Sequence, residues 1–424
     1  MKTNDLLDVW RTLSTSEKIK VGQLAKNAQG IFFQYDEDYL NTLPNGNLSP
    51  LKLKFNDELQ LAPRLFEGLH SVFSDSLPDG WGRLLMDRVF IQHQISLHSL
   101  SPLDRLAYVG ETAIGALSYQ PISPFADQDQ KLIELTQLGM EAQAIFDGQT
   151  EDILTALTQM GSSGGARPKA QVYFPTNSMS QCRSQYQQGD SAWIVKFTSN
   201  NLALKHEEGL CEMVYLDLAE QAGIDVPEHN LLSLKVKSGE RHWLAIKRFD
   251  CIENDSNQLG RLHTLTACGL LEANFREPSL DYADLIKVSN WLCQDLNAGK
   301  MQFRRAMFNL FMCNQDDHSK NWSFLLDDQG KWTLSPFYDV TFSPSPYGEH
   351  MTSFNGFGKN PSLKAIQSLA NMANLDWTEA LQIIDEVQYC VNLFDRYASL
   401  YEVGKTRKKL VQNMIYQAYK NSPF

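Results

Sequence analysis

A group of polar side chains between two apolar segments constrains this chain most, in FNLFMCNQDDHSKNWSFLL at residues 308–326. Asp316, His318, Lys320 and Asn321 follow a segment of helical character and precede a hairpin that the DDQG turn predicts. Asp339 comes directly after that hairpin. A loop framed by a buried helix and a hairpin holds its side chains rigidly. The pattern therefore predicts a site rather than a solvated connection.

The spacing Asp316-x-His318-x-x-Asn321, with Asp339 about one hairpin later, favours phosphoryl transfer. That reaction needs a carboxylate that orients and deprotonates a hydroxyl, and oxygen ligands that hold Mg²⁺. Asn and Asp side chains are usual Mg²⁺ ligands. Asp316 has the spacing expected of the catalytic base, whereas its neighbour Asp317 is expected to be solvated.

A metal-dependent hydrolase built on Asp317 and His318 is an alternative. Such a site needs further histidines at regular spacing, but His263 and His350 are isolated in the sequence. On its residue type alone, His318 is more often a hydrogen-bonded loop histidine than a ligand. This alternative therefore ranks below phosphoryl transfer.

A phosphate-contacting lysine and its partner are expected upstream. Lys196 is the single charge in the apolar strand WIVKF, and a buried lysine is costly unless it is paired. An edge-strand lysine that blocks aggregation is the alternative reading. Glu212, on the amphipathic helix that follows, is the expected partner. Glu207 and Glu208, one turn earlier, are expected to be solvated.

The glycine-rich stretch GSSGGARPK, residues 161–169, lies about 30 residues before Lys196. Backbone N–H groups of Gly164, Gly165 and Ala166, with the charge of Lys169, can cover nucleotide phosphates. The stretch fits neither standard phosphate-loop pattern, and by itself SSGG is also typical of a linker. Downstream, the strand-ending IKRFD offers backbone hydrogen bonds to a base, and its final Asp250 is placed to reach a ribose hydroxyl.

The hydrophobic patterning predicts a β-rich first half and a helical second half. Strands are expected at VGQLA, GIFFQYD, LKLKF, IGALSYQP, AQVYFPT and SAWIVKFT, with a hairpin over 230–250. A helix is expected to start near Trp81, and another to follow a polar linker before residue 150. Further helices are expected at 151–160, 206–223, 263–273, 279–297, 301–313, 363–374, 377–396 and 404–420.

Composition limits the class of protein. The 424 residues are too many for one small core, and the net charge of −12 argues against direct binding to nucleic acid. The one dense basic cluster, KTRKK at 405–409, reads as a solvated helix face. Seven cysteines without a C-x-x-C pair, no apolar leader and no long apolar run predict a soluble, cytoplasmic protein with reduced thiols and no membrane contact.

Taken together, these motifs resemble the HipA family, bacterial serine/threonine kinases that act as toxins in toxin–antitoxin modules. The motifs are VGQLA and LPDGWGRLLMDR early in the chain, then GSSGGARPK, WIVKF, CEMVYLDLAEQAGIDVPE, KRFD, NQDDHSKNWSFL and LSPFYDV. The Asp-x-His-x-x-Asn loop is also similar to that of phosphoinositide kinases. The resemblance implies an α+β, two-lobed protein-kinase-like fold. Its expected parts are a β-rich N-terminal subdomain (1–120), a small lobe (121–250) and a helical C-terminal lobe (251–424).

The resemblance also implies residue roles. Asp316 would be the base, supported by His318 and Lys320, with Asn321 and Asp339 on Mg²⁺. The implied ATP-binding residues are Gly164, Gly165, Ala166, Arg167, Pro168, Lys169, Lys196, Glu212, Lys247, Arg248, Phe249, Asp250 and Tyr338. Ser162 or its neighbour Ser163 would be autophosphorylated, which adds about −2 charge beside bound phosphates and expels the loop. GARPK differs from the family's GAQEK form, and FYDV replaces D-F-G as is normal in the family.

The family further implies protein substrates, aminoacyl-tRNA synthetases among them, and a small helix-turn-helix antitoxin that contacts operator DNA. Two other functions stay open. One is a catalytically silent corepressor that only binds the antitoxin, although the full set of expected catalytic residues speaks against it. The other is a kinase for a small molecule; a lipid substrate lacks the support of a basic amphipathic face.

Overall fold

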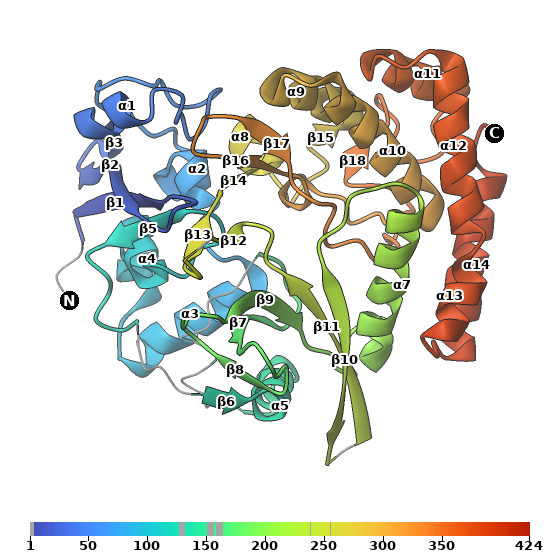
Figure 1. Ribbon diagram of the computed structural model, residues 1–424, viewed down its shortest axis with the longest axis horizontal. Helices are drawn as coiled ribbons and strands as arrows, with labels where there is room; N and C mark the ends of the chain where they lie inside the picture. Colours follow the sequence, from blue (N-terminus) through green and yellow to red (C-terminus); the bar gives the residue numbers. More distant parts are fainter. Residues whose placement is uncertain (1–3, 127–131, 151–156, 158–163, 238, 255) are drawn as a thin grey trace.

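The computed structural model describes residues 4–126, 132–150, 157, 164–237, 239–254 and 256–424. Its first part is an antiparallel sheet in the order β4-β3-β2-β1-β5, with helices packed around it (Figure 1). The strands are β1 Leu6–Thr12, β2 Lys18–Asn27, β3 Gly30–Tyr35, β4 Gln60–Leu61 and β5 Leu117–Gln120. The helices are α1 Glu37–Thr42, α2 Ser71–Ser74, α3 Gly80–Gln92 and α4 Pro102–Val109.

The small lobe is a second sheet, in the order β10-β11-β9-β7-β8-β6. Its strands are β6 Leu132–Glu134, β7 Lys169–Phe174, β8 Gln181–Arg183, β9 Ser191–Lys196, β10 His229–Val236 and β11 Gly239–Lys247. Its helices are α5 Leu135–Phe146 and α7 Glu208–Gln221. All six residues of β7 are buried. One face of the strand packs in the core with α5, and on the other face Gln171 bonds to the Thr112 carbonyl and to Arg248. Figure 1 shows α7 between β11 and the C-terminal helices.

The C-terminal lobe is mainly helical, as expected. Its helices are α8 Ala267–Leu271, α9 Tyr282–Cys293, α10 Leu296–Met312, α11 Leu363–Met372, α12 Trp377–Val391, α13 Phe394–Leu400 and α14 Lys405–Lys420. Its strands are β14 His263–Thr266, β15 Leu280–Asp281, β16 Ser323–Leu326, β17 Trp332–Leu334 and β18 Thr352–Ser353, and the small pair β12 Cys251–Glu253 and β13 Leu259–Arg261 joins it to the small lobe. The expected hairpin is β16–β17, with Leu326 paired to Trp332.

The described residues form two hydrophobic cores that connect these parts. The larger one runs from the first sheet through α7 into the C-terminal helices. The smaller one fills the space between α5 and the second sheet, and it also takes in Trp81 and Leu85 of α3. The N-terminal subdomain is therefore anchored inside the small lobe and is not a loosely tethered unit.

Three expectations about local structure are wrong. The helix expected at 377–396 is two helices, α12 and α13, separated by a turn at 392–393. Residues 51–55 form turns rather than a strand, because the Ser49 carbonyl accepts from the N–H groups of Lys52 and Leu53. The segment 263–273 begins as strand β14, paired with β16, and only α8 is helical, starting where the Thr266 side chain caps the Gly269 N–H. The helix expected at 151–160 falls almost entirely outside the described residues. In the described part of the chain, no helix has the length and apolar character needed to cross a membrane.

Candidate active site

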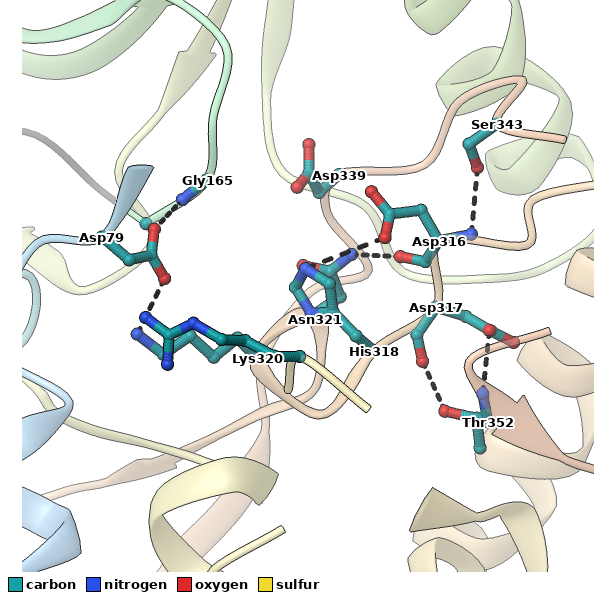
Figure 2. A network of polar contacts seen from close by, with 12 residues as sticks. Asp79, Gly165, Asp316, Asp317, His318, Lys320, Asn321, Asp339, Ser343 and Thr352 are labelled. Atoms are coloured by element: carbon teal, nitrogen blue, oxygen red, sulfur yellow. Dashed lines mark hydrogen bonds and ion pairs between the residues drawn. The ribbon is translucent and has the colours of Figure 1, made fainter. Parts of the chain in front are cut away.

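The polar segment between α10 and β16 forms a fixed loop beside the junction of the lobes (Figure 2). The side chain of Asp316 is 63% exposed, and its backbone N–H donates to Ser343 Oγ at 3.2 Å. The Asn321 amide nitrogen donates to the Asp316 carbonyl at 2.7 Å, which leaves Asn321 Oδ1 available as a ligand. The loop thus presents an exposed carboxylate close to an amide oxygen that accepts no hydrogen bond from the described residues.

Asp317 does not have the solvated position that the sequence suggested. It is buried, and its carboxylate accepts from Tyr282 Oη at 2.6 Å, from the Thr352 N–H at 3.0 Å and from His350 Nδ1 at 3.0 Å. A buried carboxylate with several donors fixes the backbone that carries it. Asp317 therefore holds the loop from behind while Asp316 points outward.

Lys196 joins three elements at the centre of the site. Its ammonium lies 2.5 Å from Glu212 Oε1 on α7 and 2.6 Å from Asp339 Oδ1, after β17. Burial disfavours the charged lysine, but the two carboxylates outweigh burial and raise the pKa of Lys196. Burial also opposes ionisation of Asp339, yet Lys196 and Lys169 hold its pKa far below the usual range. The predicted Lys196–Glu212 pair is confirmed. The aggregation-blocking role is excluded, because β9 is not an edge strand and Lys196 is paired with two carboxylates inside the protein.

Asp339 and Asn321 fit a magnesium site in their donor chemistry. Asp339 has a left-handed backbone, with φ of 56°, a sparsely populated conformation that is common where function requires it. No cluster of three or more His, Cys, Asp or Glu suited to a metal occurs among the described residues. One carboxylate with one amide oxygen suits Mg²⁺, which keeps waters and binds substrate phosphates. The Mg²⁺ roles of Asn321 and Asp339 stay predictions.

The described part of the glycine-rich loop, from Gly164 onward, lies over the same cavity as Lys196 and Asp339. Lys169 is the register partner of Lys196 across β7 and β9, and its ammonium donates to the Gly164 carbonyl at 2.5 Å. Burial lowers the pKa of Lys169. Pro168 bonds through its carbonyl to the Phe197 N–H, and Ala166 faces the adjoining cavity. The candidate modification sites, Ser162 and Ser163, lie outside the described residues.

Arg167 has a partner that the sequence did not suggest. Its guanidinium lies 2.9 Å from Glu208 Oε2, and Glu208 is buried, so the expectation of a solvated Glu208 is wrong. Glu207 is half-buried and accepts from the Gly404 N–H at 2.8 Å. The start of α7 is therefore tied both to the glycine-rich loop and to the C-terminal helices.

The strand end IKRFD lines the cavity where the lobes join, as expected. The rings of Phe249 and Tyr338 lie 5.4 Å apart at its wall. Arg248 and Asp250 form a buried pair, at 2.5 Å between Nη2 and Oδ2, and Asp250 also accepts from the Gly115 N–H at 2.7 Å. Arg248 Nε donates to the other oxygen, Oδ1, at 3.0 Å, so both oxygens of Asp250 have protein donors. No local sequence pattern indicated this structural role. Its contact with a ribose, like the base contacts of residues 247–249, stays a prediction.

His318 and Lys320 belong to the loop between α10 and β16, and Tyr338 contacts it. His318 Nε2 lies 4.0 Å from Asp316 Oδ1, and Tyr338 Oη donates to the Lys320 carbonyl at 2.7 Å. Lys320 Nζ reaches Asp79 Oδ2 at 2.8 Å (Figure 2). His318 and Lys320 therefore lie where they can support the loop.

The N-terminal subdomain contributes to the cavity, which sequence reasoning missed. Leu77, Ile114 and Leu117 line it together with Ile194 and Ile246 of the small lobe. Asp79 faces the adjoining cavity that holds Asp316. The Pro78-Asp79-Gly80 turn before α3 is the local signal in this stretch, and by itself such a turn predicts only the start of a helix.

Fold and site together define a two-lobed, kinase-like protein with an additional N-terminal subdomain. The family model described as the HipA N-terminal domain matches residues 15–120, and the one described as the HipA-like C-terminal domain matches residues 161–393. The second match alone spans more than half of the chain. The chain belongs to the HipA family.

Two known proteins are similar to this chain, one in sequence and one in structure. A curated relative, "Putative kinase Y4dM" of Sinorhizobium fredii, is 29% identical over 228 residues, and the match spans about half of each protein (50% of this chain and 52% of the relative). The HipA chain of a Shewanella oneidensis toxin–antitoxin complex with HipB and operator DNA is similar in structure, with a TM-score of 0.71 at 15% identity. That likeness covers 97% of this chain and 96% of the other, and it confirms the expected fold.

Proposed function

We propose that this protein is an ATP- and Mg²⁺-dependent serine/threonine protein kinase. One observation carries the proposal: Lys196 contacts both Glu212 and Asp339, beside a loop that presents Asp316 and Asn321. A strand lysine paired to a helix glutamate, next to a metal-binding carboxylate, is the arrangement that positions nucleotide phosphates in protein kinases. The family assignment and the kinase-named relative support the same class of reaction.

In the proposed reaction, each residue of the site has a separate role in phosphoryl transfer. Asp316 accepts the proton of the substrate hydroxyl, whose oxygen bonds to the γ-phosphorus while the bond to the ADP oxygen breaks. Lys196 and Lys169 offset charge on the phosphates, and the N–H groups of the glycine-rich loop cover them. Mg²⁺, held by Asn321 and Asp339, would neutralise charge on the phosphate oxygens. The cavity lined by Ile194, Ile246 and Tyr338 would receive the base of ATP.

The biological role we propose is that of the toxin in a toxin–antitoxin pair. Its targets are proteins of the aminoacyl-tRNA synthetase class, and it inactivates itself by phosphorylating Ser162 or Ser163. Its partner is a small helix-turn-helix antitoxin, in line with the Shewanella complex of HipA, HipB and operator DNA. With a net charge of −12, this chain contacts DNA only through that partner.

The test is transfer of label from γ-labelled ATP to the purified protein and to proteins of a cell lysate. The expected result is Mg²⁺-dependent label that Asp339→Asn abolishes, with self-label that disappears in Ser162→Ala or Ser163→Ala. A corepressor without activity would bind antitoxin but transfer nothing with Mg²⁺. A small-molecule kinase would consume ATP without labelling any protein. Wild-type protein that shows neither ATP binding nor transfer, after phosphatase treatment, refutes the proposal.

A further inference from the structure

The turn before α3, in the N-terminal subdomain, touches both lobes of the kinase site. Asp79 occupies the N-cap position of α3, where an aspartate normally accepts a backbone N–H of its own helix. Here its side chain makes no capping bond. The carboxylate is instead buried and directed at the glycine-rich loop and the catalytic loop. The Asp79 side chain therefore does not stabilise α3 by capping, and its partners lie outside the helix.

The two oxygens of Asp79 have different partners (Figure 2). Oδ1 accepts the backbone N–H of Gly165, in the glycine-rich loop. Oδ2 accepts from Lys320 Nζ at 2.8 Å, in the catalytic loop. One carboxylate thereby connects the N-terminal subdomain to the loop of the small lobe and to the loop of the large lobe. Hydrogen bonds to a charged group are stronger than neutral ones.

The neighbours of Asp79 reinforce the contact with the glycine-rich loop. The Trp81 N–H donates to the Gly165 carbonyl at 3.0 Å, and Trp81 Nε1 donates to the Lys169 carbonyl at 2.8 Å. Gly80 has φ of 43°, and a Cβ at this position would lie 2.6 Å from the Gly165 carbonyl oxygen. The backbones approach too closely for any other residue. Three consecutive residues, Asp79, Gly80 and Trp81, thus form the contact with the glycine-rich loop.

The charge on Asp79 is stable because of these partners. Burial alone would favour the neutral acid, but Lys320, with the Gly165 N–H and Lys169, lowers the pKa of the carboxyl group. Asp79 is therefore ionised at neutral pH and makes charge-assisted bonds to both loops. Trp81 is fully buried in the small-lobe core, so the turn that carries Asp79 has a fixed position.

We propose that Asp79 is a positioning residue: it sets the distance between the glycine-rich loop and Lys320 of the catalytic loop, and so prepares the loop for nucleotide phosphates. The N-terminal subdomain is then a working part of the kinase site. This inference rests on the proposed function for its effect on ATP. The loop contact itself does not depend on that function.

The test compares Asp79→Ala and Asp79→Asn with Asp87→Asn. Asp87 lies on the same helix and pairs with Arg105 away from the site, which makes it a matched control. The first readout is hydrogen exchange of the peptide that contains residues 164–174, in nucleotide-free protein. Asp79→Ala is expected to speed exchange at Gly165 by about tenfold, the effect of losing one charge-assisted bond. Asp79→Asn, which still accepts from Gly165, should retain most of the protection.

The second readout separates binding from turnover. Asp79→Ala is expected to raise the KM for ATP about tenfold or more, because ATP must then order the loop itself. Unchanged exchange at Gly165 in Asp79→Ala, or an equal change in Asp87→Asn, overturns the proposal. Tighter ATP binding by Asp79→Ala also overturns it, since Asp79 would then compete with phosphate. If the wild type neither binds nor uses ATP, the proposed function fails, and exchange at Gly165 still decides the role of Asp79.

Discussion

Removing the ammonium of Lys196 should destabilise the protein itself, apart from any loss of activity. The Lys196 and Glu212 side chains are 13% and 4% exposed, and Asp339 is 30% exposed. Lys196→Met leaves the two carboxylates facing each other without their shared cation. Removing one partner of a buried pair costs about 3–5 kcal/mol. Because Asp339 is partly exposed and Lys169 remains nearby, we expect the lower end, about 3 kcal/mol.

The assay is equilibrium urea unfolding of nucleotide-free protein, with Lys20→Met as the matched control. Lys20 is also a strand lysine in a pair, at 2.8 Å from Asp8, but both side chains are about one-third exposed. Such a pair contributes about 0–1 kcal/mol. Adding Glu212→Gln to Lys196→Met should restore about 1–2 kcal/mol, because it removes one of the uncompensated charges. Equal losses in the two lysine variants, or no recovery in the double variant, would refute the reasoning.

Two further predictions concern buried groups outside the catalytic loop. Arg248→Met should cost about 3–5 kcal/mol of unfolding free energy, because Asp250 is left buried without its main cation, and adding Asp250→Leu should recover part of it. Chemical unfolding checks this, and a double variant no more stable than the single one contradicts it. Burial, with a nearby arginine, lowers the pKa of His263 to about 3, so the unfolded chain binds a proton below about pH 6.5 that the native chain does not. The free energy of unfolding should therefore decrease as the pH is lowered, and at pH 5 this group should account for a loss of about 2 kcal/mol. His263→Gln should remove that part of the pH dependence in unfolding curves, and an unchanged dependence contradicts the assignment.

Sequence patterns predicted the elements whose residues carry a strong local signal. The helical spacing of apolar residues in α7 and the Gly-containing turn of the β16–β17 hairpin were sufficient to place both elements. The expected amphipathic character of α7 is wrong, because most of its residues are buried. The lone charge in WIVKF predicted a paired lysine, and Glu212 proved to be the partner. Local patterns were therefore sufficient to predict features that depend on a single strand, helix or turn.

The sequence could not distinguish residues whose role depends on distant partners. Asp316 and Asp317 are neighbours of the same type, and the packing of Tyr282, His350 and Thr352 makes the second one interior. The β-strand at 263–266 forms because β16 is available to pair with it. Asp79 lies 86 residues from Gly165 in sequence, so no local pattern reports their contact.

The central claim is that Asp316 acts as the base beside a nucleotide held by Lys196 and its partners. The direct test is single-turnover transfer from Mg²⁺–ATP by wild type and Asp316→Asn, with the dissociation constant for Mg²⁺–ATP measured on both proteins. In this account Asp316 would contact the substrate hydroxyl and not the adenine or ribose of ATP. Transfer should therefore fall by about 10²–10⁴-fold while the dissociation constant changes by less than about threefold. Transfer at the wild-type rate by Asp316→Asn would contradict the account, as would a loss of nucleotide binding large enough to explain the loss of transfer.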